Sequence, residues 1–108
     1  MKPAAIREAS IEARGDGRFV LSGDLCFENA ARVLEAGDAA FGGQTGIEVD
    51  LAQVGRVDSA GLALLIEWAY AARATGGVVR YRNVPAGAVA LAGISDVSEL
   101  LEDTAPAA

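Results

Sequence analysis

An aspartate, a serine and two small residues stand together in the stretch VDSAGLALL, residues 57–65. A serine hydroxyl in this setting can cap a helix, or it can be a contact and phosphorylation site. Both roles suit the first turn of a helix, where unpaired backbone N–H groups and the positive end of the dipole favour an anion. Asp58 and Ser59 are the candidate caps. Ala60 and Gly61 are small enough to let another surface approach the backbone closely.

The residue types that most catalytic sites need are scarce in this chain. It contains no histidine, which excludes serine–histidine and cysteine–histidine pairs and histidine-ligated metal sites. Its one lysine, Lys2, does not follow a glycine-rich loop, which excludes a Walker-type nucleotide site. The lone cysteine, Cys26, has no base within sequence reach and is expected to be a small buried hydrophobe. We therefore expect no enzyme, no metal and no cofactor.

The charge balance of the chain is acidic. Nine basic residues against fifteen acidic ones give a formal net charge of -6, which repels nucleic-acid phosphates and anionic membrane surfaces. No apolar run reaches the roughly 18 residues that span a bilayer. We expect a cytoplasmic protein that neither binds nucleic acid nor inserts into a membrane. Five acids in polar segments are expected to be solvated, namely Glu8, Glu12, Asp16, Asp24 and Asp38.

The apolar pattern predicts one α/β domain. In chain order the expected elements are strands over 9–14 and 18–25, a helix over 27–41, a strand over 46–51, a tight loop over 55–57, a helix from 58 to about 75, a strand over 78–84, and short helices over 85–92 and 96–101. The first two strands flank a glycine turn and should pair as a hairpin. Together these elements make a small mixed sheet of four to five strands flanked by about four helices.

The long predicted helix carries two apolar stripes. One consists of Leu62, Leu65, Ile66 and Ala69, and the other of Leu64, Trp68 and Ala71. One stripe must cover the sheet. Leu64 and Trp68 on the other stripe either belong to an ordinary core beneath another helix or form a docking surface, for which tryptophan is well suited.

The stretch DLAQVGRVDSAGLALLIEW, with VLSGDLCFENA before it and RNVPAGAVALAGISDVSELL after it, resembles the STAS domain family over residues 9–101. Residues 1–8 are then a flexible lead-in and 102–108 a flexible tail. The family includes anti-sigma factor antagonists, cytoplasmic tails of anion transporters and the MlaB subunit of a bacterial phospholipid-transporting ABC complex. The MlaB type is the most similar.

The resemblance implies which residues contact a partner. In the family, a serine or threonine after the aspartate begins the long helix and is either phosphorylated by a partner kinase or buried in the partner contact; by position this is Ser59. Asp58, Ala60 and Gly61 match the same motif. With Leu64 and Trp68 from the second stripe, these residues make up the expected partner-binding site.

The resemblance also implies a function. It suggests a non-catalytic subunit that docks on, and stabilises or regulates, the MlaF-like ATPase of an inner-membrane phospholipid-transport ABC complex, and that is held at the inner membrane through this partner. The alternative is an anti-sigma factor antagonist switched by phosphorylation of Ser59 by an anti-sigma factor kinase. The apolar continuation LALLIEW departs from the antagonist pattern and favours a permanent contact. A small nucleotide-binding domain is a third possibility.

Overall fold

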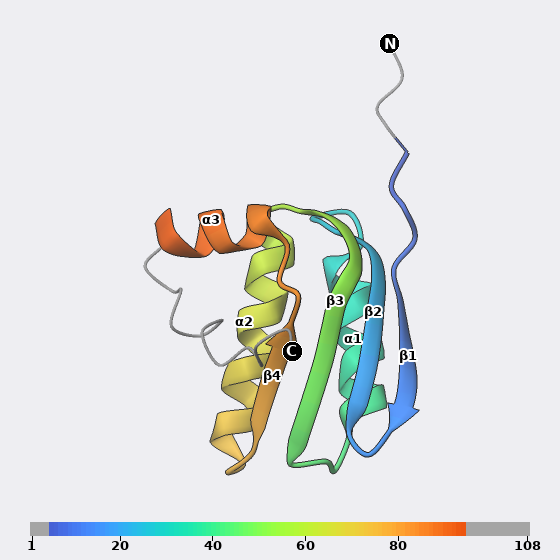
Figure 1. Cartoon of the computed structure of the whole chain (residues 1–108), viewed down its shortest axis with the longest axis vertical. Helices are drawn as coiled ribbons and strands as arrows, with labels where there is room; N and C mark the ends of the chain where they lie inside the picture. The colour runs from blue at the N-terminus through green and yellow to red at the C-terminus, as the bar shows by residue number, and fades with distance from the viewer. Residues whose placement is uncertain (1–4, 95–108) are drawn as a thin grey trace.

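The computed structural model describes residues 5–94, which form a four-stranded mixed sheet and three helices (Figure 1). The elements are β1 (Ser10–Gly15), β2 (Arg18–Leu25), α1 (Ala30–Phe41), β3 (Gly46–Val57), α2 (Ser59–Ala74), β4 (Val78–Arg82) and α3 (Ala86–Ile94). The strand order is β1-β2-β3-β4, with β1 antiparallel to β2 and the other neighbours parallel. The predicted hairpin and the mixed α/β sheet are confirmed. The helix expected over 96–101 lies outside the described residues.

Two helices cover one face of the sheet. Figure 1 shows α1 and α2 behind the sheet, and α3 at the end of the sheet where α2 begins. Alternate residues of the strands point toward these helices, and the buried ones include Phe19, Leu21, Ile47, Val49, Leu51, Val79 and Tyr81. The phenol of Tyr81 donates a hydrogen bond to the backbone oxygen of Leu65 at 2.6 Å, which ties β4 to α2.

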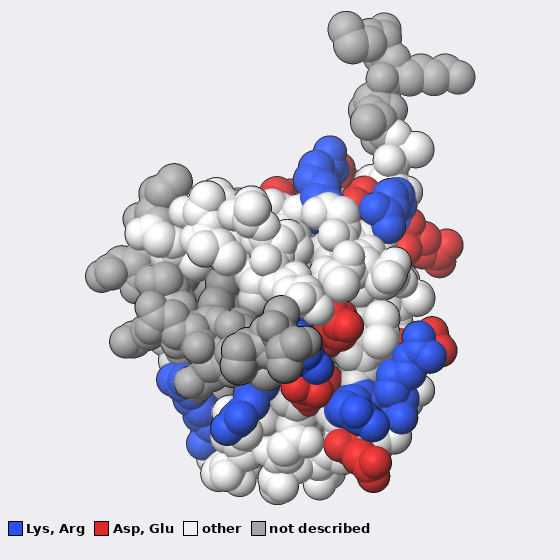
Figure 2. All heavy atoms as spheres, viewed as in Figure 1, with Lys and Arg blue, Asp and Glu red and all other residues white. Residues whose placement is uncertain are grey.

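The opposite face of the sheet is charged. Figure 2 shows arginine and acidic side chains interleaved across it. In β3, Glu48 and Asp50 alternate with the buried residues, and Arg82 of β4 lies beside Glu48, with 3.8 Å between the Arg82 Nε and the carboxylate. A face of this composition is stable in water. The apolar core therefore lies on the other face, between the sheet and α1 and α2, and Ala88 and Ala92 of α3 are also buried.

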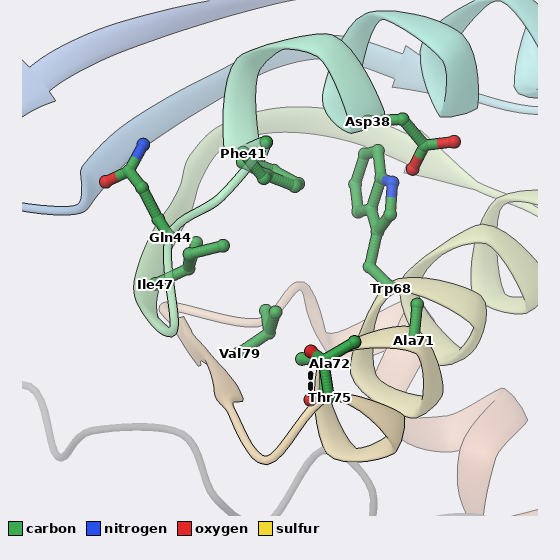
Figure 3. Close-up of a pocket in the computed structure, with 10 residues that line it drawn as sticks. Asp38, Phe41, Gln44, Ile47, Trp68, Ala71, Ala72, Thr75 and Val79 are labelled. Carbon is green, nitrogen blue, oxygen red and sulfur yellow. Dashed lines mark hydrogen bonds between the residues drawn. The ribbon is translucent and has the colours of Figure 1, made fainter.

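An aromatic cluster joins the two helices to the sheet. The rings of Phe19 and Phe41 pack edge to face with 4.9 Å between their centroids. Those of Phe41 and Trp68 pack in the same way with 5.1 Å between their centroids (Figure 3). The indole of Trp68 lies against Gly37 of α1, where a Cβ atom would collide with the ring. Because both helices lie on one face of the sheet, each must bury a second flank against the other. The second apolar stripe of α2 is therefore part of the core.

This packing corrects the prediction of an exposed docking stripe on α2. Leu64 is 4% exposed and Trp68 is 2% exposed, so neither side chain is available to a partner in the folded domain. The alternative of an ordinary core beneath another helix is the correct one, and α1 is the covering helix. The other stripe is also largely buried, with Leu62, Leu65 and Ala69 inside the domain.

The largest differences from the predicted element boundaries are at α1 and β3. α1 begins at Ala30, because Ala30 N–H bonds to the carbonyl of Cys26 in a turn that leaves Phe27 outside the helix. β3 continues through the residues predicted as a tight loop, since Val54 and Val57 pair with the end of β2. The parallel ladder thus overrides the local signal of Gly55.

Asp24 is not the solvated charge that its place near a turn suggests. It is 7% exposed, and its two carboxylate oxygens accept hydrogen bonds from the backbone N–H groups of Arg56 and Arg7, each at 2.9 Å. These two hydrogen bonds hold the pKa of Asp24 below its ordinary value, in spite of burial. Asp24 therefore joins the segment before β1 to the end of β3. The other four of the five acids are exposed, as predicted.

Candidate functional site

Asp58 is the residue that caps α2. One of its carboxylate oxygens accepts hydrogen bonds from the backbone N–H groups of Ala60 at 2.9 Å and Gly61 at 3.0 Å. The other oxygen accepts the N–H of Phe27 at 3.0 Å. Burial alone would raise the pKa of the Asp58 carboxyl, but these hydrogen bonds and the nearby charge of Arg56 outweigh it and lower the pKa. Asp58 is therefore an ionised link between the helix and the loop before α1.

Ser59 is exposed at the tip of α2, as its first helical residue. Since Asp58 supplies the cap, the hydroxyl of Ser59 is not needed for it. Within residues 5–94 this hydroxyl makes no hydrogen bond. Its side chain is therefore open to a contact or to a modification.

Gly61 serves the domain's own packing. It is buried, and a Cβ atom at this position would collide with the backbone oxygen of Leu25 at the end of β2. The surface that approaches the helix closely is thus the chain's own strand, and the expectation that Gly61 lies open to a partner is wrong. Ala60 is half-buried and borders a groove between α1 and α2.

Phe27 is a candidate site residue that the sequence does not predict. Its side chain is 82% exposed, the largest exposure among the exposed large apolar residues of the described chain. A buried network holds its loop in place: Asn29 donates to the carbonyl of Asp24 at 2.8 Å and accepts from the N–H of Cys26 at 3.0 Å. An asparagine that bonds local backbone in this way marks a turn before a helix. That signal could have placed Phe27 outside α1.

A shallow apolar groove lies between the first halves of α1 and α2. It has a volume of about 310 Å³ and is lined by Ala30, Ala31, Leu34, Ala60, Ala63, Leu64 and Glu67. Its alanines leave room for side chains of another protein, and the buried Leu64 lies against it. We call Phe27, Ser59 and this groove the docking surface. Asp58 joins its parts through the hydrogen bonds to Phe27 and to the start of α2.

The cap at Asp58 predicts a pH-dependent stability. Asp58→Ala is expected to lower the free energy of unfolding by about 1–2 kcal/mol at neutral pH, because two helical N–H groups and one loop N–H lose their acceptor. Since the folded-state pKa lies below the ordinary 3.8, the stabilisation by the carboxylate is complete above that value and is lost as the pH falls through the folded pKa. Urea unfolding monitored from neutral to acidic pH measures this.

The free energies of unfolding of the wild-type protein and of Asp58→Ala should therefore converge as the solution is acidified. Glu35→Ala, which changes an exposed acid of α1, is the matched control and should leave the stability nearly unchanged. If the difference in free energy of unfolding between wild type and Asp58→Ala stays the same below the folded-state pKa of Asp58, the charge of Asp58 is not what stabilises the fold.

Within residues 5–94 no group of histidine, cysteine, aspartate and glutamate side chains could hold a metal ion. The same part of the chain has no helix with the length and apolar character needed to cross a membrane. The chemistry offered by the site is thus that of an exposed aromatic ring, a free hydroxyl and a small-residue groove.

Comparison with known proteins gives one family and a set of similar folds. The family model described as "Mlab, STAS domain" matches residues 10–102. No curated protein matches the chain.

Several solved structures share the fold. A putative anti-sigma factor antagonist from Thermotoga maritima is 17% identical, with a TM-score of 0.69 over 88% of this chain and 82% of that one. The phosphorylated form of the Bacillus cell fate determinant SpoIIAA is 15% identical, with a TM-score of 0.64 over 87% and 88%. A sulfate transporter family protein from Wolinella succinogenes is 16% identical, with a TM-score of 0.62 over 85% and 75%. These likenesses establish the fold.

Proposed function

Because this chain belongs to the STAS domain family, we propose that it is a non-catalytic binding subunit that docks on the ATPase of an inner-membrane phospholipid-transport ABC complex and stabilises or regulates it. The description of the matching family as the MlaB type supports this assignment. In this role the protein is cytoplasmic and is held at the inner membrane through an MlaF-like ATPase. The observation that carries the proposal is the exposed Phe27 ring, on a loop whose N–H bonds to Asp58, the residue before the exposed Ser59.

The docking surface has the properties of a protein-binding site. An aromatic side chain that is 82% exposed gains free energy when a partner removes it from water. Its loop is already ordered by Asn29 and Asp58, so little conformational entropy is lost on binding. Ala60 and the groove beside it can admit apolar side chains of the partner, while Glu67 contributes a polar rim.

Ser59→Glu is expected to weaken binding to the ATPase at least tenfold. A glutamate would place a bulky charge in a contact that has to exclude water. Ser59→Ala should keep the affinity within about threefold, since a single neutral hydrogen bond contributes little net free energy. Pull-down from native membranes, with the ATPase identified by mass spectrometry, followed by a binding titration with that purified ATPase, measures both. Recovery of no ATPase by the wild-type chain would refute the proposal.

A second function is supported by the free hydroxyl of Ser59. The protein would then be an anti-sigma factor antagonist, and a kinase-type anti-sigma factor would phosphorylate Ser59 to end the contact. The exposed position of Ser59 at the positive end of the α2 dipole suits a phosphoryl group. Incubation with such a kinase and ATP, followed by mass spectrometry, distinguishes the two functions. A Ser59 that never carries phosphate excludes the switch and leaves the ATPase proposal intact.

A further inference from the structure

The segment before β1 is bonded to both central strands of the sheet. We call residues 5–9 the N-terminal strap; in Figure 1 it lies beside the end of β2, where α2 begins. Arg7 donates its backbone N–H to the carboxylate of Asp24 at 2.9 Å, and its carbonyl accepts the N–H of Asp24 at 3.0 Å. The guanidinium of Arg7 reaches past β2 and donates from Nη2 to the backbone oxygen of Gln53 in β3 at 3.2 Å.

Each central strand has a glycine where the strap crosses it. A Cβ atom at Gly23 of β2 would collide with the backbone of Glu8. A Cβ atom at Gly55 of β3 would lie 2.7 Å from the Nη1 atom of Arg7 and 2.6 Å from the carboxylate of Asp24, which is closer than a Cβ atom comes to its neighbours. A side chain at either position would therefore displace the strap.

The ladder between β2 and β3 is irregular at the same place. Between its last two pairs with β2, the β3 strand has one residue more than β2, so Gly55 and Arg56 both lie opposite Asp24. A bulge of this kind interrupts the ladder hydrogen bonds. Here the carboxylate of Asp24 accepts the N–H of Arg56 at 2.9 Å, and the guanidinium of Arg7 lies against Gly55. The strap and Asp24 thus supply contacts between the strands where the ladder is interrupted.

The docking surface begins directly beyond this bulge. Phe27 stands two residues after the end of β2, and Ser59 stands two residues after the end of β3. The two loops are joined, because Asp58 donates its N–H to the carbonyl of Leu25 at 3.2 Å and accepts the N–H of Phe27 at 3.0 Å. The position of Phe27 relative to Ser59 therefore depends on how the ends of β2 and β3 are held together.

We propose that Arg7 is a positioning residue for the docking surface, which it holds in its binding geometry by fixing the bulge at Gly55 and Arg56. This inference rests on the proposed function, in which Phe27 and Ser59 contact the ATPase. A surface that is already held in its bound geometry loses less conformational entropy when the partner binds. Loosening the ends of β2 and β3 should therefore weaken binding even though no contact residue has changed.

Amide hydrogen exchange, followed by NMR on the partner-free protein, tests the positioning itself. Arg7→Ala should speed the exchange of the N–H groups of Arg56 and Phe27 about tenfold, because their acceptors are then held less firmly. The N–H group of Val78, which is bonded at the other end of the sheet, should exchange at the wild-type rate. An equal increase at all three groups, or no increase at Arg56 and Phe27, would overturn the proposal.

Gly55→Ala disturbs the same contact from the side of β3. Its methyl group displaces the guanidinium of Arg7 and should speed the exchange of the same two N–H groups, while circular dichroism checks that the fold is kept. The double variant should fall well short of the product of the two single effects, since both remove one contact. A double variant that reaches this product contradicts the proposal. Arg14→Ala, at the other end of β1, is the matched control and should leave the exchange unchanged.

Affinity for the purified ATPase connects the positioning to the function. Arg7→Ala and Gly55→Ala should each weaken binding about fivefold, and Arg14→Ala should not. Weaker binding of Arg7→Ala without faster exchange would make Arg7 a direct contact and overturn the positioning role, as would faster exchange with wild-type affinity. If the wild-type chain binds no ATPase, the proposed function fails and this inference fails with it; if only the effects of Arg7→Ala are missing, this inference fails alone.

Discussion

Trp68→Ala is expected to lower the free energy of unfolding by about 3–5 kcal/mol, the usual cost of truncating a large buried aromatic side chain. The ring is 2% exposed, meets Phe41 edge to face and fills the space above Gly37. Its removal leaves a cavity where α1, α2 and the sheet meet. Since small domains are stable by only about 5–15 kcal/mol, the variant should lose a large part of its stability. Urea unfolding followed by far-UV circular dichroism measures the loss without relying on tryptophan fluorescence.

Tyr70→Ala is the matched control for this prediction. Tyr70 lies on the same helix but is 55% exposed, so its removal should change the free energy of unfolding by no more than about 0.5 kcal/mol. A Trp68→Ala variant as stable as Tyr70→Ala would mean that α1 does not cover the second stripe of α2. It would also restore Trp68 as a candidate contact residue.

Under the proposed function, Phe27→Ala should weaken binding to the ATPase by about 30-fold or more, which corresponds to about 2 kcal/mol and is typical of an aromatic hot spot. The free energy of unfolding of Phe27→Ala should differ little from that of the wild type, because the ring is exposed to solvent. The loop is held by hydrogen bonds of backbone groups and of Asn29. The affinity of purified variant and wild type for the ATPase tests this. The unfolding free energies of both proteins establish that a loss of binding is not a loss of fold.

Val89→Ala provides the comparison for Phe27. Val89 is a 51% exposed apolar residue on α3, outside the docking surface, and its truncation should leave the affinity unchanged. If Phe27→Ala and Val89→Ala lose equal affinity for the ATPase, the binding depends on exposed apolar residues in general and not on the docking surface. A Phe27→Ala variant that binds as well as wild type would remove Phe27 from the interface and require a different contact on this domain.

The sequence predicts those parts of the fold whose signals are local. α2 was expected from residue 58 to about 75 and spans Ser59–Ala74, because a capping aspartate precedes it and two glycines follow it. The hairpin follows from its glycine turn, where Gly15 and Gly17 both have positive φ. The position of Ser59 at the start of α2 could also be predicted, since the capping of a helix depends on residues that are neighbours in the sequence.

What could not be predicted depends on contacts between distant segments. The periodicity of the sequence shows that α2 has two apolar stripes, but it does not show which element covers the second one. α1 covers it, because Gly37 has no side chain and leaves room for the Trp68 ring. Phe27 has helical spacing with the apolar residues of α1, yet the hydrogen bonds of Asn29 and Asp58 hold it outside the helix. Asp24 is buried because β3 continues past Gly55 and brings the N–H of Arg56 to it.

One carboxylate serves both the start of α2 and the loop that presents Phe27. Under the proposed function, stability and partner recognition therefore depend on the same residue, and a substitution at position 58 that changes one of them also changes the other. Adaptation to a new partner is then expected at Phe27 and along the alanine groove, where side chains can change while Asp58 and the hydrogen bonds around it stay as they are.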